Sequence, residues 1–530
     1  MPSCKTLIRQ CRMPFPQRFP HAFKHVIETV GRSPRLLDCP SLARRGVACM
    51  LGFLALSVSA KGFPPYPDDP LDTHTAVSAT PGRAVTEAGA DPCQSPGRKM
   101  DTWGLIDVIE QALCHNPQTR QAWANARQQA SQLGSAESAY LPSITFSMPI
   151  SASKNTAGGG ISDGVPVQGS GDFRAYNTRI APRLGFDYLL LDFGGRAARV
   201  EAARKALEAA NWTHAATLQA VLFSAIQAYY QLYAANATQE AAEATEKSTQ
   251  RALDVATYRY QIGAAALGDK LQAQTTHAQA KVNRRTAVGN AQAALGALAT
   301  VMGLKPHASM KFESPSLSGP DQEREKDVQE LIELAKNSRP DLAAAEAQVR
   351  ASEAGILQAR AGSMPTLSLV GSFTYFETVG VSTVSSWAVG VQVAMPLFTG
   401  FNNTYQIKSA GEQAEAQAAN RDKLEQSVAQ EVWRAYYTLA ATKENLKNTQ
   451  ELLDSALQSE QVALGRYEEG VGNIVELLNT VASLANARTQ YVQAHYNWRI
   501  GKAQLAQALG RLDMGDVAAV EGPRENRLAN

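Results

Sequence analysis

The sequence predicts a mainly helical protein with a small membrane-spanning β part, built from two tandem structural repeats. Three observations lead to this fold class. The chain repeats its own motifs at fixed displacements. Each repeat contains a helical pattern too long for a compact globule. Each repeat also contains two segments of about ten residues in which apolar side chains alternate with small or polar ones.

The composition excludes two broad classes of protein. The 530 residues include 51 Lys and Arg against 49 Asp and Glu, so the formal net charge of +2 disfavours a strongly basic nucleic-acid binder. The longest uncharged apolar run, at residues 46–60, is shorter than the roughly 20 residues that a spanning helix needs. A transporter made of several spanning helices is therefore excluded.

That apolar run has the layout of a secretory signal peptide. Arg44 and Arg45 precede it, and Val58, Ser59 and Ala60 supply small residues for cleavage. We therefore expect residues 1–60 to be a leader with a signal peptide, the alternative being a buried core helix. Residues 61–100 contain several Pro, Gly, Ser and Thr and show no periodicity, which predicts a flexible N-terminal segment.

Export also bears on the cysteines. The chain has six, and four of them lie in the predicted leader. Only Cys93 and Cys114 remain after its removal. In an oxidising compartment these two are expected to form one disulfide, with a pair of free thiols as the alternative.

The two repeats are recognised by matching motifs. Asn116-Pro117 recurs as Arg339-Pro340, displaced by 223 residues, and Arg259-Tyr260 recurs as Arg466-Tyr467, displaced by 207. The displacement falls because the first copy has an insertion, most simply the glycine-rich, turn-like stretch at 154–172. We expect repeat 1 over residues 101–310, a linker over 311–326, repeat 2 over 327–511 and a flexible tail over 512–530.

Each repeat has the same internal order. A first helix (105–140; 328–362) precedes two strands, a very long helix (197–262; 403–469) and a return helix. At 1.5 Å per residue, each long helix would extend about 100 Å. Heptad-spaced residues on these helices favour coiled-coil packing, with an ordinary bundle core as the alternative. They are Leu218, Leu222, Ala225, Tyr229 and Leu232 in the first copy and Val428, Val432, Ala435 and Leu439 in the second.

The four alternating segments predict the β part. Each has one apolar row, which includes Ile144 and Phe146, Leu184 and Tyr188, Leu367 and Phe373, and Trp387 and Val391. Such strands are typical of membrane barrels, although a small soluble sheet with one buried face has the same alternation. Four strands cannot close a barrel in lipid. Three chains would supply twelve, so we expect a trimer.

The motifs resemble those of the TolC family of outer-membrane efflux and secretion channels. The resemblance rests on strand-to-helix elbows at 190–195 and 395–400, on helical turns at 259–263 and 466–470, and on a helix start at 112–117. That start is most similar to members serving type I secretion of large toxins. The resemblance implies a homotrimer with a twelve-strand barrel in the outer membrane and a twelve-helix tunnel extending into the periplasm.

The same resemblance implies the function and the partners. The protein would be a passive, gated conduit for an exported protein or drug. It would be opened at its periplasmic tip by a periplasmic adaptor (membrane fusion) protein and an inner-membrane ABC or proton-driven pump. Outer-membrane lipid would surround the barrel, and no nucleic acid is implied. The rival hypothesis is a periplasmic coiled-coil adaptor or scaffold without a pore.

The resemblance also assigns roles to tip residues. Glu476 and Asn479 match an acidic ring at the tunnel entrance, although the second is neutral. Asp269 and Tyr467 match a contact between helix pairs, whereas Gly472 stands where that contact has an arginine, for which Arg466 is the candidate substitute. The turns that would face the adaptor contain Ile262, Gly263, Glu469 and Gly470.

No catalytic motif is visible in the sequence. It lacks the His-Glu-x-x-His zinc motif, the Gly-x-Ser-x-Gly elbow and the lysine loop of nucleotide-binding proteins. The histidines are scattered without metal-ligand spacing. We therefore expect neither an enzyme nor a cofactor or metal site.

Overall fold

The computed structural model describes residues 69–85, 91–93, 102–156, 161–162, 165–166, 174–306, 310–312, 327–378 and 384–513. The signal peptide predicted at 1–60 lies outside these residues. The chain divides into two compact units. One comprises Asp69–Thr145, Gly185–Ser372 and Ala388–Asn530 and contains all the described helices. The other contains the strand segments in Phe146–Leu184 and Phe373–Trp387.

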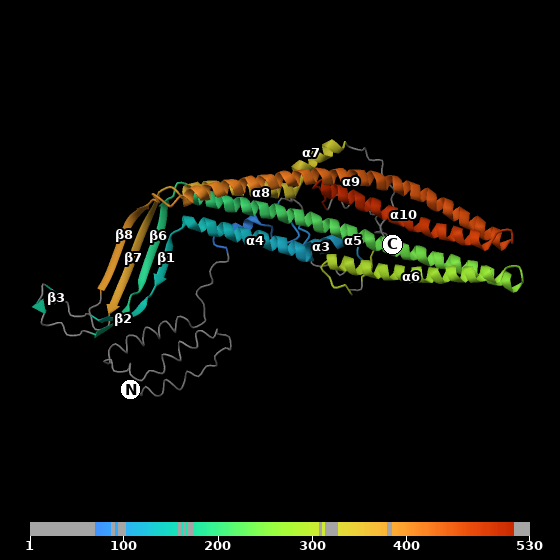
Figure 1. The fold of residues 1–530 in the computed structure, drawn as a ribbon, viewed down its shortest axis with the longest axis horizontal. Coiled ribbons are helices and arrows are strands. Elements are labelled where there is room, and N and C mark those ends of the chain that lie inside the picture. The colour runs from blue at the N-terminus through green and yellow to red at the C-terminus, as the bar shows by residue number, and fades with distance from the viewer. Residues whose placement is uncertain are drawn as a thin grey trace, which may run out of the picture. The chain divides into compact units, whose positions relative to one another are not determined.

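The helical unit repeats itself element by element (Figure 1). Helices α5 (Gly195–Gln261) and α9 (Asn402–Glu468) have 67 residues each, and α6 (Leu267–Val301) and α10 (Ile474–Ala508) have 35 each. The long helices begin and end within two residues of their predicted bounds. Each return helix folds back along the long helix that precedes it. No described helix is long and apolar enough to cross a membrane.

The prediction of a single first helix in each repeat is wrong, because a proline divides this helix into two. Repeat 1 has α3 (Leu105–His115) and α4 (Pro117–Glu137), and repeat 2 has α7 (Val328–Ser338) and α8 (Pro340–Ala361). Asn116 and Arg339 are extended, with ψ of 132° and 124°. A proline disfavours helical ψ in the residue before it and lacks the N–H of a helix interior. Short 3-10 helices cover Ser138–Tyr140 and Thr73–Ala76.

The largest core cluster surrounds the middle of α5. The five predicted heptad residues of this helix are all buried, and they pack with α3 and the end of α6. In the second copy, Val428, Val432 and Ala435 are buried against α7 and the end of α10, and Leu439 is half-buried. The packed face predicted for each long helix is therefore confirmed at these positions.

Residues 69–85 differ from the flexible segment that the sequence predicted. They lie along α4 and α5, where Val77 is buried. The Trp123 Nε1–H donates to the Ser78 carbonyl oxygen at 2.9 Å, and His214 Nε2 is 2.9 Å from the Pro81 carbonyl oxygen. Polar groups that the periodicity did not reveal therefore hold this segment in place. A disulfide between Cys93 and Cys114 (Cα–Cα 5.5 Å) also links the N-terminal segment, predicted at 61–100, to α3.

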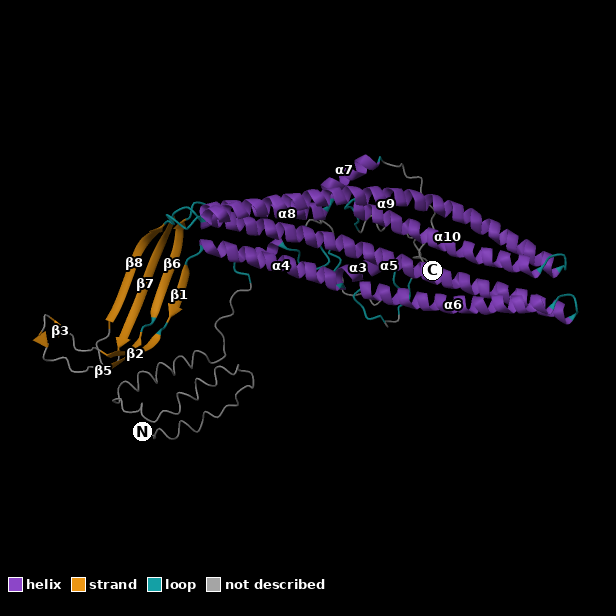
Figure 2. Ribbon diagram, viewed as in Figure 1, coloured by secondary structure: helices purple, strands orange, loops and turns teal. Residues whose placement is uncertain are grey.

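The four predicted strands are present, but the first of them is interrupted (Figure 2). The sheet order is β1 (Ser143–Ser147), β6 (Arg183–Leu191), β7 (Thr366–Thr378), β5 (Arg174–Ile180) and β2 (Ile150–Thr156), and β8 (Val384–Ala394) also pairs with β7. Pro149 and Pro182 divide the strands of the first copy, because proline cannot donate to a sheet ladder.

Part of the stretch at 154–172, predicted to be turn-like, is strand. Strands β2 and β5 pair antiparallel from Ile150↔Ile180 to Thr156↔Arg174, so the hairpin continues beyond its two prolines. Two short strands, β3 (Ile161–Ser162) and β4 (Val165–Pro166), pair within the stretch. Its other residues lie outside the described part of the chain. The alternating pattern ended too early to predict this extension.

The apolar rows of the strands remain exposed in the single chain. Ile144 and Phe146 are each 68% exposed, and Trp387 is 77% exposed. All of β8 is exposed. These side chains are not buried against any described part of the chain, as a soluble sheet with one buried face would require.

Candidate functional site at the helix tips

The two tip turns share one backbone design. α5 ends at Gln261 and α9 at Glu468, and the glycines two residues later, Gly263 and Gly470, have positive φ values of 77° and 83°. The Ala264 N–H donates to the Arg259 carbonyl oxygen at 2.8 Å, and the Val471 N–H donates to the Arg466 carbonyl oxygen at 3.0 Å. This is the glycine-dependent Schellman end of a helix. Each turn thereby directs the chain into its return helix.

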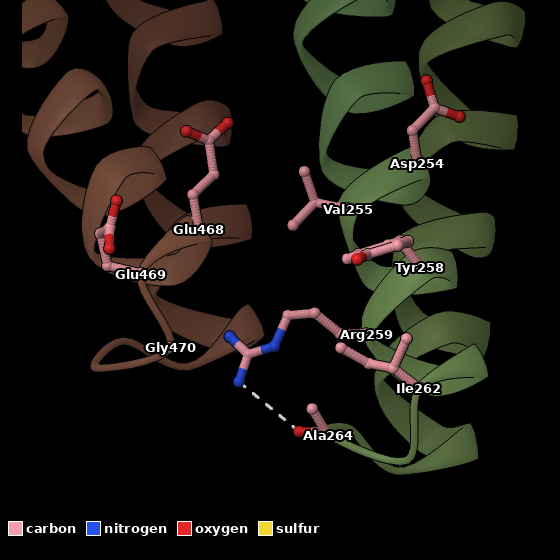
Figure 3. A pocket seen from close by; sticks show the side chains of 9 residues that line it. All are labelled: Asp254, Val255, Tyr258, Arg259, Ile262, Ala264, Glu468, Glu469 and Gly470. Carbon is pink, nitrogen blue, oxygen red and sulfur yellow. Dashed lines mark hydrogen bonds between the residues drawn. The ribbon is translucent and has the colours of Figure 1, made fainter.

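Arg259 connects the two tips. Its Nη1 donates to the Tyr467 carbonyl oxygen at 2.6 Å, and its Nη2 donates to the carbonyl oxygen of Ala264 at 3.5 Å. The guanidinium carbon lies 4.8 Å from the centre of the Tyr467 ring, a cation–π distance. Figure 3 shows Arg259 reaching from its own helix toward Gly470. A single side chain of repeat 1 thus holds the end of the long helix of repeat 2.

Tyr467 is buried at this junction. It is 2% exposed, and its hydroxyl has no hydrogen-bond partner within the described residues. Burial raises the pKa of the phenol, the positive charge of Arg259 opposes this rise, and the negative charge of Asp269 adds to it. Asp269 thus acts on Tyr467 through its charge but makes no hydrogen bond to its hydroxyl, and Arg259 provides the hydrogen-bonded link between the helix pairs.

Arg466, the repeat equivalent of Arg259, behaves differently. Its Nη1 lies 2.7 Å from Oε1 of Glu476, and the Glu476 N–H donates to the Asn473 side-chain oxygen at 2.7 Å. Arg466 therefore does not replace the missing arginine beside Asp269. Glu476 has a positive neighbour, which the sequence alone did not predict. Asn479 is exposed one turn further along α10.

Steric crowding explains why position 472 is a glycine. A Cβ there would lie 3.0 Å from the Tyr467 nitrogen and 3.1 Å from the Arg466 carbonyl carbon. The Gly472 N–H donates to the Arg466 carbonyl oxygen at 2.8 Å. The close approach to the end of α9 favours glycine, and this chain therefore has no arginine at the position that the resemblance indicated.

A groove of about 510 Å³ lies between the two tips. Arg259 crosses it, and three carboxylates stand around it (Figure 3). Tyr258 and Ile262 are 63% and 60% exposed. The groove therefore offers apolar side chains beside mostly negative charge. Its lining residues are Asp254, Val255, Tyr258, Arg259, Ile262, Ala264, Glu468, Glu469 and Gly470.

The family model described as "Outer membrane efflux protein" matches residues 108–304 and 331–511, one segment in each repeat. The chain belongs to this family. It is therefore an outer-membrane channel protein of the efflux and secretion class, and the family is not one of enzymes. The rival hypothesis of an adaptor without a pore is not supported.

Individual relatives agree with this assignment. The chain is 30% identical to Protein CyaE of Bordetella pertussis over 89% of its length and 97% of that protein. It is 22% identical to Outer membrane protein TolC of Escherichia coli, covering 78% of this chain and 84% of that protein. A solved structure of CusC has a TM-score of 0.66 at 20% identity and covers 82% of this chain and 98% of that one, which shows the same fold.

Arg259 is the site residue that the sequence analysis missed. In the sequence, Arg259 served only as a repeat marker and as part of a turn motif, whereas Arg466 was the arginine expected to link the helix pairs. Their equivalence could have indicated that the channel uses one arginine to cross between repeats and its copy to pair locally. Which arginine crosses could not be inferred, because the partner of Arg259 lies 208 residues away in sequence.

Proposed function

We propose that three copies of the chain form a passive conduit that is closed at the helix tips in its resting state. The outer strands of the described sheet, β1 and β8, each have a described partner on one side only. Open sheet edges are not tolerated in lipid, so pairing between copies would satisfy both. The exposed apolar rows of the strands would then face lipid. Three copies would supply twelve strands and twelve long or half-length tunnel helices.

The gating proposal rests on the position of Arg259. The Arg259–Tyr467 contact ties the tips of the two repeats together through a hydrogen bond and a cation–π contact. Separation of the tips, which would widen the entrance, requires this contact to break. An opening partner would therefore first need to displace the half-buried Arg259 side chain from Tyr467.

The partners we propose are a periplasmic adaptor and an inner-membrane pump, of the ABC or proton-driven type. The groove between the tips, with exposed Tyr258 and Ile262 beside carboxylates, suits an amphipathic helical segment carrying basic residues. The tip residues Ile262, Gly263, Glu469 and Gly470 would lie at this contact. The conduit would then carry an exported protein or a drug supplied by the pump.

The entrance would also be lined by charge. Three copies of Glu476 around the axis would attract cations, as rings of carboxylates do in channels. Because each Glu476 is paired with Arg466, the ring would be weaker than three free carboxylates. Asn479 would add no charge.

The gating proposal is tested by single-channel recording in planar bilayers. Arg259→Ala should raise the resting conductance several-fold, because it removes the link between the tips. The matched control is Arg251→Ala, which changes an exposed arginine of the same helix outside the groove and should leave conductance unchanged. Wild-type conductance in Arg259→Ala would show that this arginine does not hold the gate.

A further inference from the structure

We propose that a pocket beside the middle of α5 binds a small organic cation that carries an aromatic ring. Helix α5 lies between α6 and α10 here (Figure 1). The pocket is formed by α5, α6, Tyr496 of α10 and the segment at 310–312, and its volume of about 460 Å³ is that of a small-molecule site. It lies within a single chain and away from the tips, so the proposal does not depend on the proposed conduit or its gate.

One side of the pocket is an apolar wall that the chain holds in place. Leu232 of α5 and Ala291 of α6 are buried. Phe312 packs against the largest core cluster, and the Trp103 N–H donates to the carbonyl oxygen of the neighbouring Lys311 at 2.8 Å. This backbone contact fixes the segment that closes the wall. The wall is therefore a preformed surface against which a flat apolar group can pack.

The other side carries polar groups and one negative charge. Asn236, Glu240 and Gln292 are exposed, and their side chains make no hydrogen bond or ion pair within the described residues. Tyr496 is 8% exposed, and its hydroxyl has no hydrogen-bond partner among the same residues. Burial raises the pKa of this phenol, the positive charge of Arg499 opposes the rise, and the negative charge of Glu240 adds to it. Arg499 does not line the pocket, so the charge at its lining is that of Glu240.

Repeat 2 has an aromatic ring and a cation at the equivalent positions. Adding the displacement of 207 places Trp498 at the position of Ala291 and Lys502 at that of Leu295. Trp498 is 6% exposed, and the Lys502 Nζ lies 5.5 Å from the centre of its ring, a cation–π distance. Repeat 2 therefore supplies from its own chain the two groups that repeat 1 lacks.

The neighbours of Trp498 correspond to the lining of the pocket. Trp498 belongs to a buried cluster against which Leu439 of α9 packs, and Leu439 is the repeat equivalent of Leu232. The charge is reversed between the repeats, because Lys447 stands where repeat 1 has Glu240. The ligand would thus place its ring against the apolar wall and its cationic group beside Glu240, where a charge-assisted hydrogen bond can form.

Tryptamine is a suitable probe, because it joins an indole ring by a short chain to a primary ammonium group. Isothermal titration calorimetry of the full chain in mild detergent should show one saturable site per chain. Indole, which has the ring without the charge, should bind about tenfold more weakly or less, because it makes no charged hydrogen bond to Glu240. Absence of saturable tryptamine binding, or equal affinity for indole, would overturn the proposal.

Two variants locate the site. Ala291→Trp introduces the residue of repeat 2 and should abolish binding by filling the pocket. Glu240→Gln keeps the shape of an exposed side chain, so it tests the site even if Ala291→Trp does not fold. It should weaken tryptamine binding about tenfold and leave indole binding unchanged. The matched control is Glu243→Gln, which removes a carboxylate of the same helix that accepts from Gln239 outside the pocket and should keep wild-type affinity.

Two results would contradict this assignment. Wild-type tryptamine affinity in both Ala291→Trp and Glu240→Gln would mean that the probe binds elsewhere. If tryptamine failed to bind and a photoreactive side chain at position 292 cross-linked another protein in cells, the ring and the cation would come from a protein partner, and the small-molecule site would be excluded.

Discussion

Helices α5 and α9 are copies of one element, yet their surroundings differ. Both have 67 residues and end in the same turn, but 19 residues of α5 are buried and only 8 of α9. α5 is covered on two sides, by its own repeat and by repeat 2. α9 is covered mainly by its own repeat, through α7, α8 and α10, and repeat 1 reaches it at the tip, where Arg259 contacts Tyr467. The comparison shows that duplication fixes the length and the turn of a helix, whereas burial depends on which neighbours are present.

Truncation of equivalent aromatic residues should give the largest difference between α5 and α9. Tyr230→Ala should lower the free energy of unfolding by about 3–5 kcal/mol, because it empties a fully buried site. Tyr437→Ala should change it by only about 0.5 kcal/mol when copies are kept apart. Thermal unfolding followed by circular dichroism at low protein concentration measures both. Equal losses would mean that the two faces are not differently covered.

The disulfide is specific to repeat 1, because Asn337 of repeat 2 stands where repeat 1 has Cys114. Removal of the link between Cys93 and Cys114, 21 residues apart, should cost about 3 kcal/mol by loop entropy. The double variant with serine at both positions should exchange amide hydrogens faster at residues 73–85. Helix α7 should be unaffected. If α7 exchanged faster too, the link would not be specific to repeat 1.

Acid should destabilise the chain at His495, a buried histidine of α10. Burial, followed by the positive charge of Arg499, lowers the pKa of His495 to about 4. The folded chain therefore keeps this histidine neutral, whereas the unfolded chain takes up a proton below about pH 6.5. Stability is lost as pH falls from 6.5 toward 4, by roughly 3 kcal/mol in total.

His495→Gln tests this directly, because it should flatten the pH dependence of unfolding in that range. The repeat equivalent of His495 is Val288, so α6 has no such dependence at this position. His115→Gln, at an exposed site, is the control and should keep the wild-type pH profile. An unchanged profile in His495→Gln would exclude this histidine as the cause.

The smallest expected effects concern the pair of Arg466 and Glu476, which repeat 1 does not form with its own Arg259. Exposed ion pairs contribute at most about 1 kcal/mol, so neither Arg466→Gln nor Glu476→Gln should much change stability. Reversal potentials should nevertheless move in opposite directions, toward greater cation selectivity in Arg466→Gln and toward less in Glu476→Gln. Asn479→Asp should strengthen block by divalent cations. Identical reversal potentials in all variants would exclude an acidic entrance.

The structural features that could be predicted from the sequence are those set by neighbouring residues or present in both repeats. The long helices were predicted from heptad spacing around residues such as Leu218 and Val428. Their ends were predicted from turn motifs that occur in both repeats. The proline breaks at Pro117 and Pro340 were readable in principle, since a proline restricts the residue before it. The hairpin extension of β2 and β5 was not, because the side-chain alternation ended where the strands continue.

The tip was predicted less well for a physical reason. Its position followed from Gly263 and Gly470, which the turns require. Its contacts join residues from both repeats, and the two equivalent arginines bind different partners there. Sequence could not decide that Arg259 crosses to Tyr467 while Arg466 pairs with Glu476, because that choice depends on how the two helix pairs pack.

The equal lengths of α5 and α9 restrict how this protein can change over evolutionary time. An insertion of seven residues in α5 alone would preserve the heptad pattern but move its tip by about 10 Å. Arg259 would then no longer reach the end of α9, although every helix would remain intact. Lengthening is tolerated only when α5, α6, α9 and α10 all gain the same segment. Relatives with longer or shorter helical parts should therefore differ by four matched insertions or deletions.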